Sequence, residues 1–212
     1  VTYLNREGDT CISKAIDAEW KKRVIEAHRK NKREIAAMED GSDDLKRVYK
    51  QYGTTLLGLL ITKTFVFALQ LGDGDICYAN ASGLELVIEP EKMLGVETHS
   101  LSRDNAWEKA ITVVRRFDLA DHLPAMFVLS SDGFANSYKS EDEFHNTVID
   151  YLKMINEHGA KAVEENLPSW LSETSSMGCG DDITMLIAYF SQDDEKKVPV
   201  QEPAKDEVDA IE

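Results

Sequence analysis

Cysteine is scarce in this sequence, and the few cysteines lie far apart. The 212 residues contain three of them, Cys11, Cys77 and Cys179, with no CxxC pair. A disulfide-rich secreted domain or a cysteine zinc site needs cysteines in larger or more closely spaced sets. We therefore expect neither, and we interpret Cys179 as a packed turn residue in a protein of a reducing, cytoplasmic compartment.

Positive charge is also in short supply. Lys and Arg number 24 against 39 Asp and Glu, which gives a formal net charge of -15 and a pI near 4.8. Such a surface repels the phosphate backbone of nucleic acids and the headgroups of anionic membranes. We expect no nucleic-acid partner and no membrane partner, and a phosphate-bearing substrate would need bound cations or a local basic group.

No apolar run is long enough to cross a membrane as a helix. The longest, Leu56 to Leu71, contains Lys63 and falls short of the roughly 20 residues required. A chain of 212 residues with 42% hydrophobic content supports one domain, which we place at residues 1–190. Residues 191–212 carry eight acidic and three basic residues with almost no apolar pattern, so we interpret them as an acidic disordered tail or linker.

Hydrophobic periodicity predicts a mixture of helices and strands. We expect helices at 13–38, capped by Ser13, at about 144–158 and at about 163–171, where Pro168 suggests a bend or a fresh start. We expect strands at 55–62, 64–70, 76–79, 84–88, 110–117, 125–129 and 183–190, with the first four forming an antiparallel meander. Because strands are not alternated with helices in βαβ units, the pattern predicts an α+β layered sandwich.

Three short acidic turns adjoin these strands. They are Gly72-Asp73-Gly74-Asp75, Ser131-Asp132-Gly133 and Gly180-Asp181-Asp182. Each Asp-Gly pair alone is ordinary turn chemistry. Together, however, strand-anchored carboxylates and glycine carbonyls offer the oxygen ligands that hard divalent cations prefer, so the set predicts a metal site.

The same residues resemble a known family, the metal-dependent protein phosphatases of type 2C, and in particular its bacterial branch. The matching stretches occur in order: Tyr52-Gly53-Thr54-Thr55, Leu71-Gly72-Asp73-Gly74, Ser130-Ser131-Asp132-Gly133 and Asp181-Asp182-Ile183-Thr184, with Thr98 in a further threonine-bearing stretch. The resemblance covers about residues 52–190. It implies a central antiparallel β-sandwich flanked by α-helices.

The resemblance also implies a mechanism. Asp132, Gly133 and Asp181 would hold two Mn²⁺ or Mg²⁺ ions, and Asp73 would belong to a third, weaker site. The metal pair would activate a water molecule for in-line attack on phosphoserine or phosphothreonine in a phosphoprotein substrate, opposing a serine/threonine kinase. No protein nucleophile is needed, and Ser130 and Ser131 have no histidine at a recognisable spacing.

Several features of the family are not recognisable in this sequence. Relatives carry an early aspartate-glycine that bridges both metals, an upstream arginine that binds phosphate and often an acid histidine. Gly8-Asp9 has the reverse order, so we interpret Asp9 as turn chemistry; and because the chain begins at Val1, we expect that opening strands lie upstream. Asp182 replaces the usual asparagine, and Asn136 stands where many relatives have the aspartate of the third metal site.

Three functions therefore remain open at this point: an active phosphatase, a non-catalytic binding or regulatory module on the same fold, and a haloacid dehalogenase-like phosphatase. The last is favoured only by the acidic stretches at residues 73–75 and 180–182. It is the weakest, because Ile76-Cys77-Tyr78 continues as a strand where that family turns toward a helix, and its lysine motif is absent.

Overall fold

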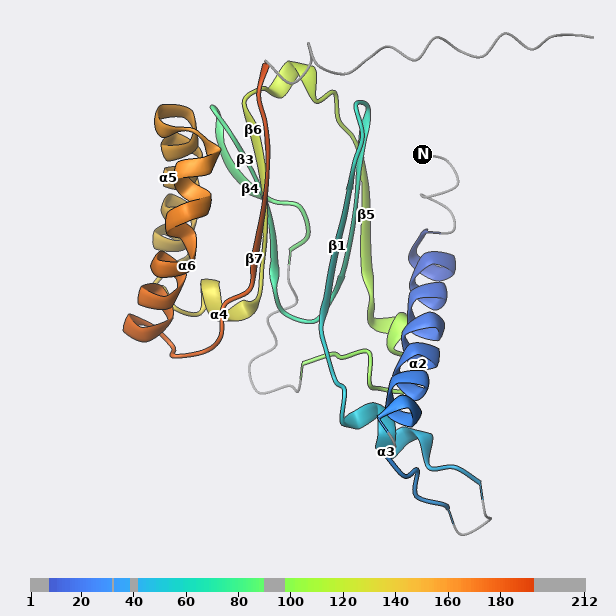
Figure 1. The fold of residues 1–212 in the computed structure, drawn as a ribbon. Helices are drawn as coiled ribbons and strands as arrows, with labels where there is room; N and C mark the ends of the chain where they lie inside the picture. Colours follow the sequence, from blue (N-terminus) through green and yellow to red (C-terminus); the bar gives the residue numbers. More distant parts are fainter. Residues whose placement is uncertain (1–7, 32, 39–41, 90–97, 193–212) are drawn as a thin grey trace, which may run out of the picture.

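Two antiparallel sheets pack face to face between layers of helices (Figure 1). The computed structural model describes residues 8–31, 33–38, 42–89 and 98–192. The strands are β1 (Leu56–Ile61), β2 (Phe65–Leu71), β3 (Asp75–Asn80), β4 (Gly83–Leu86), β5 (Ile111–Arg116), β6 (Ala125–Ser130) and β7 (Met185–Phe190). The helices are η1 (Gly8–Ile12), α2 (Ser13–Lys30), α3 (Leu45–Lys50), η2 (Ala106–Lys109), η3 (Ala120–His122), α4 (Asp132–Ala135), α5 (Glu141–His158) and α6 (Ala160–Met177).

One sheet has the strand order β1-β2-β5 and the other β4-β3-β6-β7, with every neighbouring pair antiparallel. In Figure 1, α5 and α6 cover the outer face of the four-stranded sheet, and α2 lies outside the three-stranded sheet. The α+β class and the β-sandwich flanked by helices are therefore confirmed.

The predicted four-strand meander is wrong, because β2 and β3 belong to different sheets. The turn between them begins at Gly72, whose φ of +113° is a conformation that L-residues with side chains rarely adopt. This sharp change of direction carries the chain from one sheet to the other. The two hairpins on either side, β1-β2 and β3-β4, form as the periodicity predicts.

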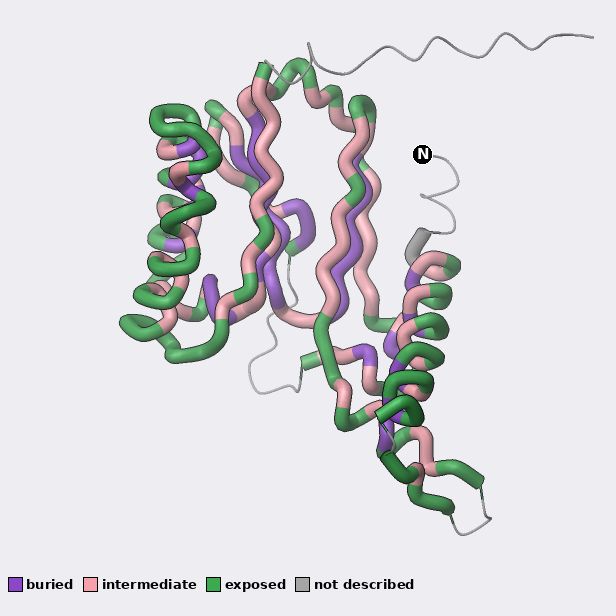
Figure 2. Tube along the Cα trace, viewed as in Figure 1, coloured by how far each residue is buried: buried purple, intermediate pink, exposed green. Residues whose placement is uncertain are grey.

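Two apolar layers hold the sandwich together (Figure 2). Between the sheets, Val66 and Ala68 of β2 pack with Ile76 and Tyr78 of β3 and with Phe127 of β6. The second layer lies between the four-stranded sheet and α5/α6, and its buried members include Phe134, Phe144, Val148, Tyr151 and Ile155. Burial of each large side chain stabilises the fold by about 1.5–3 kcal/mol. These two layers therefore hold the strands, and with them the strand ends, in place.

Helix α2 ends earlier than its periodicity predicts. It runs from Ser13 to Lys30, not to about residue 38, because Asn31 leaves the helical conformation and the amide of Arg33 returns to the carbonyl of His28. His28 is buried and bonds the hydroxyl of Tyr52 at 3.1 Å. The predicted cap is also wrong: Ile12 occupies the N-cap position, without a side-chain capping bond, because the chain enters α2 directly from η1.

Helix α5 follows its pattern closely, whereas α6 extends three residues before and six residues beyond the expected range 163–171. Helix α5 ends before Gly159, and α6 continues through Pro168 without a break, so the suggested fresh start there does not occur. No helix in the described ranges is long and apolar enough to cross a membrane. Apart from residues 191 and 192, the predicted tail lies outside the described residues.

Candidate metal centre

The three acidic turns lie at the same end of the sandwich, the lower end in Figure 1. Asp73 follows β2, Asp132 follows β6, and Asp181 precedes β7 in the loop after α6. Strands β3, β6 and β7 are neighbours in one sheet, and β2 enters from the other. The fold thus brings to one end of the sandwich aspartates that lie between 49 and 108 positions apart in the sequence.

The β2-β3 turn is held from inside the protein. The side-chain amide of Gln70 donates to the carbonyl oxygens of Gly72 at 3.2 Å and Gly74 at 2.8 Å. At Gly74 a Cβ atom would lie 2.5 Å from the carbonyl oxygen of Ser130, so only glycine lets this turn approach β6 closely. Asp73 at the tip accepts a 2.6 Å hydrogen bond from the hydroxyl of Thr98.

Ser131 joins the turn that carries Asp132 to the loop that carries Asp181. Its hydroxyl donates to the carbonyl oxygen of Asp182 at 3.2 Å and accepts from the amide of Thr184 at 2.9 Å. Its amide also donates to the carbonyl oxygen of Thr184 at 2.9 Å. These bonds extend the pairing of β6 and β7 beyond the strands and set the separation of the two aspartates.

The turn that carries Asp132 and the loop that carries Asp181 approach each other closely at Gly133. A Cβ atom at Gly133 would lie 2.7 Å from the carbonyl oxygen of Asp182 and 3.4 Å from the Cβ of Asp181. The carboxylate of Asp181 accepts from the amide of Asp182 at 2.9 Å, and its carbonyl oxygen accepts from the hydroxyl of Ser175 at 2.6 Å. The loop before β7 is therefore fixed to α4 on one side and to α6 on the other.

The carboxylate of Asp132 is affected by two other negatively charged side chains. Burial raises the pKa of its carboxyl group above the usual value, and the carboxylates of Asp73 and Asp181 raise it further, while the backbone amides of Gly133 and of Asp132 itself act in the opposite direction. Among the described residues, both charged side chains that act on Asp132 are acidic. Such uncompensated repulsion is the condition that a bound cation relieves.

Ser137, which the sequence did not single out, and Cys179 contact the same turn. Cys179 lies in a turn as expected, but it is exposed and not packed in the interior. The hydroxyl of Ser137 donates to the carbonyl oxygen of Gly133 at 2.7 Å, and the thiol of Cys179 lies 3.5 Å from the same oxygen. Gly178 packs directly on Ser137, leaving no room for a side chain. Ser137 and Gly133 are four positions apart, whereas Gly178 and Cys179 lie more than forty positions from them, so only the fold brings the two segments together.

The oxygen atoms at this end of the sandwich are of the kind that a hard divalent cation binds, but too few side chains are placed to hold one ion. Carboxylate and carbonyl oxygens are the ligands that Mn²⁺ and Mg²⁺ accept. Within the described ranges, however, no three acidic, histidine or cysteine side chains are placed so that they could hold one ion. Asp9 falls in η1, and its side chain is not described. Asn136 donates to Asp132 at 3.3 Å, an amide contact in place of a further carboxylate.

The arrangement around Asp75 removes one of the three functions considered. Asp75 is the first residue of β3 and is fully buried, and this strand pairs with β4 and β6 rather than leading to a helix. The haloacid dehalogenase-like interpretation is therefore wrong, since the aspartate of that family's first acidic motif should be followed by a turn toward helical structure.

Comparison with known proteins also disagrees with the haloacid dehalogenase-like interpretation. A family model described as protein phosphatase 2C matches residues 4–172, most of the chain but not Asp181. A search of curated proteins found no match. Solved structures with some likeness include a variant of a bacterial serine phosphatase (16% identity, 70% of this chain and 63% of that one, TM-score 0.48). Two others are the catalytic domain of PstP in complex with two manganese ions (12%, 84% and 81%, 0.47) and Stp1 from Staphylococcus aureus (16%, 70% and 64%, 0.45).

The chain spans less than two thirds of the first and third of these structures. All of these TM-scores lie below 0.5, so the assignment depends on the family model, which matches residues 4–172. This chain belongs to the protein phosphatase 2C family.

Proposed function

We propose that this chain is a metal-dependent phosphatase that hydrolyses phosphoserine and phosphothreonine in proteins. The observation that carries the proposal is that the three turns bearing Asp73, Asp132 and Asp181 meet at one end of the sandwich. The carboxylates of Asp73 and Asp181 both raise the pKa of Asp132 there. In a family of phosphatases, such a cluster is where a cation and a phosphate would bind together.

In this proposal the protein's own residues hold and orient the site. Asp132 and Asp181, with the carbonyl oxygen of Gly133, would hold two ions, and Asp73 would belong to a third. Bound Mn²⁺ or Mg²⁺ would supply positive charge to the phosphate oxygens and activation of the attacking water. Thr98 fixes the direction of Asp73 through its 2.6 Å hydrogen bond, and Asn136 donates to Asp132.

A further ligand must complete the centre, because the described residues place no three potential ligands around one ion. The substrate would be a phosphoprotein whose phosphorylation a serine/threonine kinase maintains, in the cytoplasm. Strong negative charge on this chain means that the metal ions would have to attract the substrate phosphate.

A non-catalytic binding module on the same fold is the second candidate, and one observation favours it. Within the described ranges no three potential ligands are placed so that they could hold an ion. Hydrolysis of p-nitrophenyl phosphate by the complete gene product, with and without Mn²⁺, separates the two functions. We expect turnover that depends on Mn²⁺ and disappears in Asp132→Asn. A folded complete protein without turnover at saturating Mn²⁺ would refute the phosphatase function and leave the binding module as the remaining candidate.

A further inference from the structure

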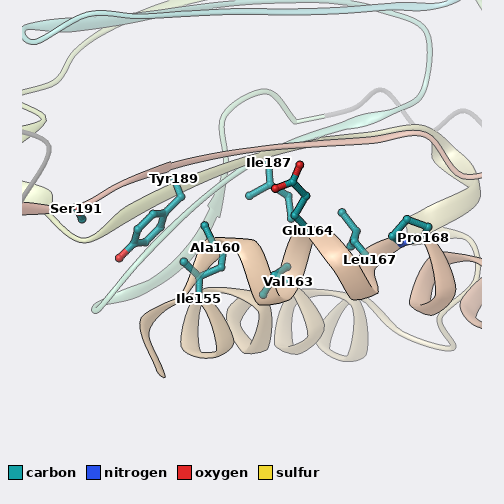
Figure 3. Close-up of a pocket in the computed structure, with 9 residues that line it drawn as sticks. All are labelled: Ile155, Ala160, Val163, Glu164, Leu167, Pro168, Ile187, Tyr189 and Ser191. Carbon is teal, nitrogen blue, oxygen red and sulfur yellow. The ribbon is translucent and has the colours of Figure 1, made fainter. Parts of the chain in front are cut away.

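Two buried side chains just before the acidic turns each have a polar atom without a hydrogen-bond partner among the described residues. They are Gln70, through Oε1, and Ser130, through Oγ. Gln70 lies three residues before Asp73, and Ser130 lies two residues before Asp132. Neither of them lines the pocket between α6 and β7 (Figure 3). Buried polar atoms without a partner are uncommon and unfavourable, so each one points to a requirement other than stability.

Gln70 occupies a position where the strand pattern favours an apolar side chain. Alternate residues of a strand face the same way, and Val66 and Ala68 of β2 pack in the apolar layer between the two sheets. Gln70 continues this row and is only 1% exposed. An apolar side chain here would avoid the burial of Oε1 without a partner. The packing between the sheets therefore does not account for a glutamine at this position.

The side-chain amide of Gln70 binds the backbone on both sides of Asp73. Its nitrogen donates to the carbonyl oxygen of Gly72 at 3.2 Å, one residue before Asp73, and to that of Gly74 at 2.8 Å, one residue after it. Because both partners are carbonyl oxygens, only the NH₂ group can face them, which leaves Oε1 directed away from the turn. The two bonds thus hold the peptide groups that flank the aspartate.

The glycines on either side of Asp73 explain why such bonds are needed. Glycine gives the backbone a wide choice of conformations, so the segment Gly72-Asp73-Gly74 does not select one turn by itself. The glycines are required nevertheless. A Cβ atom at Gly72 would lie 2.5 Å from Cγ2 of Thr55, and one at Gly74 would lie 2.5 Å from the carbonyl oxygen of Ser130. Gln70 therefore supplies the hydrogen bonds that select one conformation of a turn in which only glycines fit.

We propose that Gln70 is a positioning residue of the metal centre, whose amide holds the Asp73 turn so that the carboxylate is directed at its ion. This inference deepens the proposed function and rests on it, because there Asp73 belongs to the third ion. Thr98 donates a 2.6 Å hydrogen bond to the carboxylate itself. Gln70 thus fixes the backbone of this ligand and Thr98 fixes its side chain. Gln70 is buried and acts only through Asp73.

Gln70→Met tests this role in the absence of metal. Methionine has a similar length but lacks both the donor and the unpartnered oxygen. We expect the Tm of the metal-free chain to stay within a few degrees of the parent, because the loss of two hydrogen bonds and the removal of a buried oxygen offset each other. The backbone order parameter of Asp73, measured by nitrogen-15 relaxation, should fall. Gln51→Met replaces an exposed glutamine whose amide bonds Arg47, and it should change neither quantity.

Binding of Mn²⁺ to the complete protein, followed by electron paramagnetic resonance, gives the second readout. In Gln70→Met the dissociation constant of the weakest ion should rise at least fivefold, and those of the tighter ions should stay within twofold. In the Asp73→Asn background, Gln70→Met should leave every remaining ion within twofold, because a residue that acts through Asp73 has no effect once the carboxylate is gone. No rise for the weakest ion, or a rise for the tighter ions in either background, overturns the proposal.

Gln70→Leu is the second variant if Gln70→Met does not fold. Failure of both to fold would show that Gln70 is required for the fold itself, and the positioning role would be wrong. Hydrolysis of p-nitrophenyl phosphate separates this inference from the proposed function. Mn²⁺ binding that depends on Gln70 without hydrolysis would refute the phosphatase function alone. Mn²⁺-dependent hydrolysis with no effect of Gln70→Met on the weakest ion would refute the positioning role alone, and a complete protein that binds no Mn²⁺ would refute both.

Discussion

The hydroxyl of Thr98 donates a 2.6 Å hydrogen bond to the carboxylate of Asp73. The two residues are twenty-five positions apart, and this bond fixes a carboxylate at the tip of a turn that is only partly exposed. Bonds to charged acceptors are among the stronger ones in proteins, so Thr98 restricts the directions in which Asp73 can present its oxygens. Thr98 thus acts on the candidate metal centre by positioning one ligand.

Replacing Thr98 tests this role. Thr98→Val keeps the shape of the side chain and removes the donor, so Asp73 should gain rotational freedom. We expect the apparent affinity for Mn²⁺, read from the Mn²⁺ dependence of turnover by the complete protein, to fall a few-fold. A few-fold fall corresponds to less than about 1.4 kcal/mol, below the roughly 1.5–3 kcal/mol of a hydrogen bond to a charged group, because Asp73 itself remains in place. Thr98→Ser keeps the hydroxyl and should behave as the parent, and equal losses in both variants would rule out the hydrogen bond as the cause.

Asp132→Asn should abolish phosphatase activity and leave the fold intact. The carboxylate has a raised pKa, so between the usual pKa of aspartate and the raised value the folded protein binds more protons than the unfolded chain. Stability of the metal-free protein therefore falls as pH rises through this window. Above the window the charged carboxylate is destabilising, and the amide removes that cost.

Thermal melts in the absence of metal measure this effect. Asp132 is partly exposed, so solvent screening limits the gain at pH 7 to about 1 kcal/mol, a rise in Tm of a few degrees. The gain should shrink as pH falls toward the usual pKa of aspartate. Activity of Asp132→Asn within a few-fold of the parent at saturating Mn²⁺ would remove Asp132 from the proposed centre.

Gly133→Ala should force apart the turn that carries Asp132 and the loop that carries Asp181. The new methyl group would lie 2.7 Å from the carbonyl oxygen of Asp182, so the loop before β7 must move away from α4. We expect a loss of about 1–3 kcal/mol in the free energy of unfolding, measured by urea denaturation, together with weaker Mn²⁺ dependence. Gly58→Ala is the matched control, since its methyl group meets Leu69 at an ordinary 3.8 Å. A loss in the control as large as in Gly133→Ala would show that crowding beside Asp182 is not the cause.

The strands and C-terminal helices were predictable because their signals are local. Alternating or continuous apolar runs located β1, β2, β5, β6 and β7 to within about two residues, and the spacing of Phe144, Val148 and Ile155 located α5. The division into two sheets was not predictable in the same way. It depends on a positive φ at Gly72, and the sequence Gly-Asp-Gly fits a hairpin within one sheet equally well.

The structure brings the turns of Asp73, Asp132 and Asp181 to one end of the sandwich, and their role as metal ligands stays a prediction. The contacts that hold these aspartates could not be predicted. The positions of Asp73, Asp132 and Asp181 could be predicted because each lies next to the end of a strand, and a sheet fixes where its strands end. The contact of Ser137 with Gly133 and the bonds of Ser131 to the loop before β7 link residues without a shared motif. The early end of α2 at Lys30 has the same origin, since bonds of His28 to Tyr52 and Glu34 overrode a helical pattern that continued to residue 38.

Titration of this 212-residue chain with Mn²⁺ tests how far its own ligands suffice. Asp73 and Asp181 both raise the pKa of Asp132, but the described residues place no three side chains around one ion, and hard cations need several oxygens to give up their water. We expect calorimetry to give a dissociation constant of about 10⁻⁴ M or weaker, the range of divalent sites with few carboxylates, and negligible turnover. Asp181→Asn should weaken binding further. Asp182→Asn, which introduces the residue usual in the family, should not. Two tight sites, or robust turnover by this chain, would mean that a further carboxylate completes the centre, and Asp9 and Asp75 would be the first two to replace.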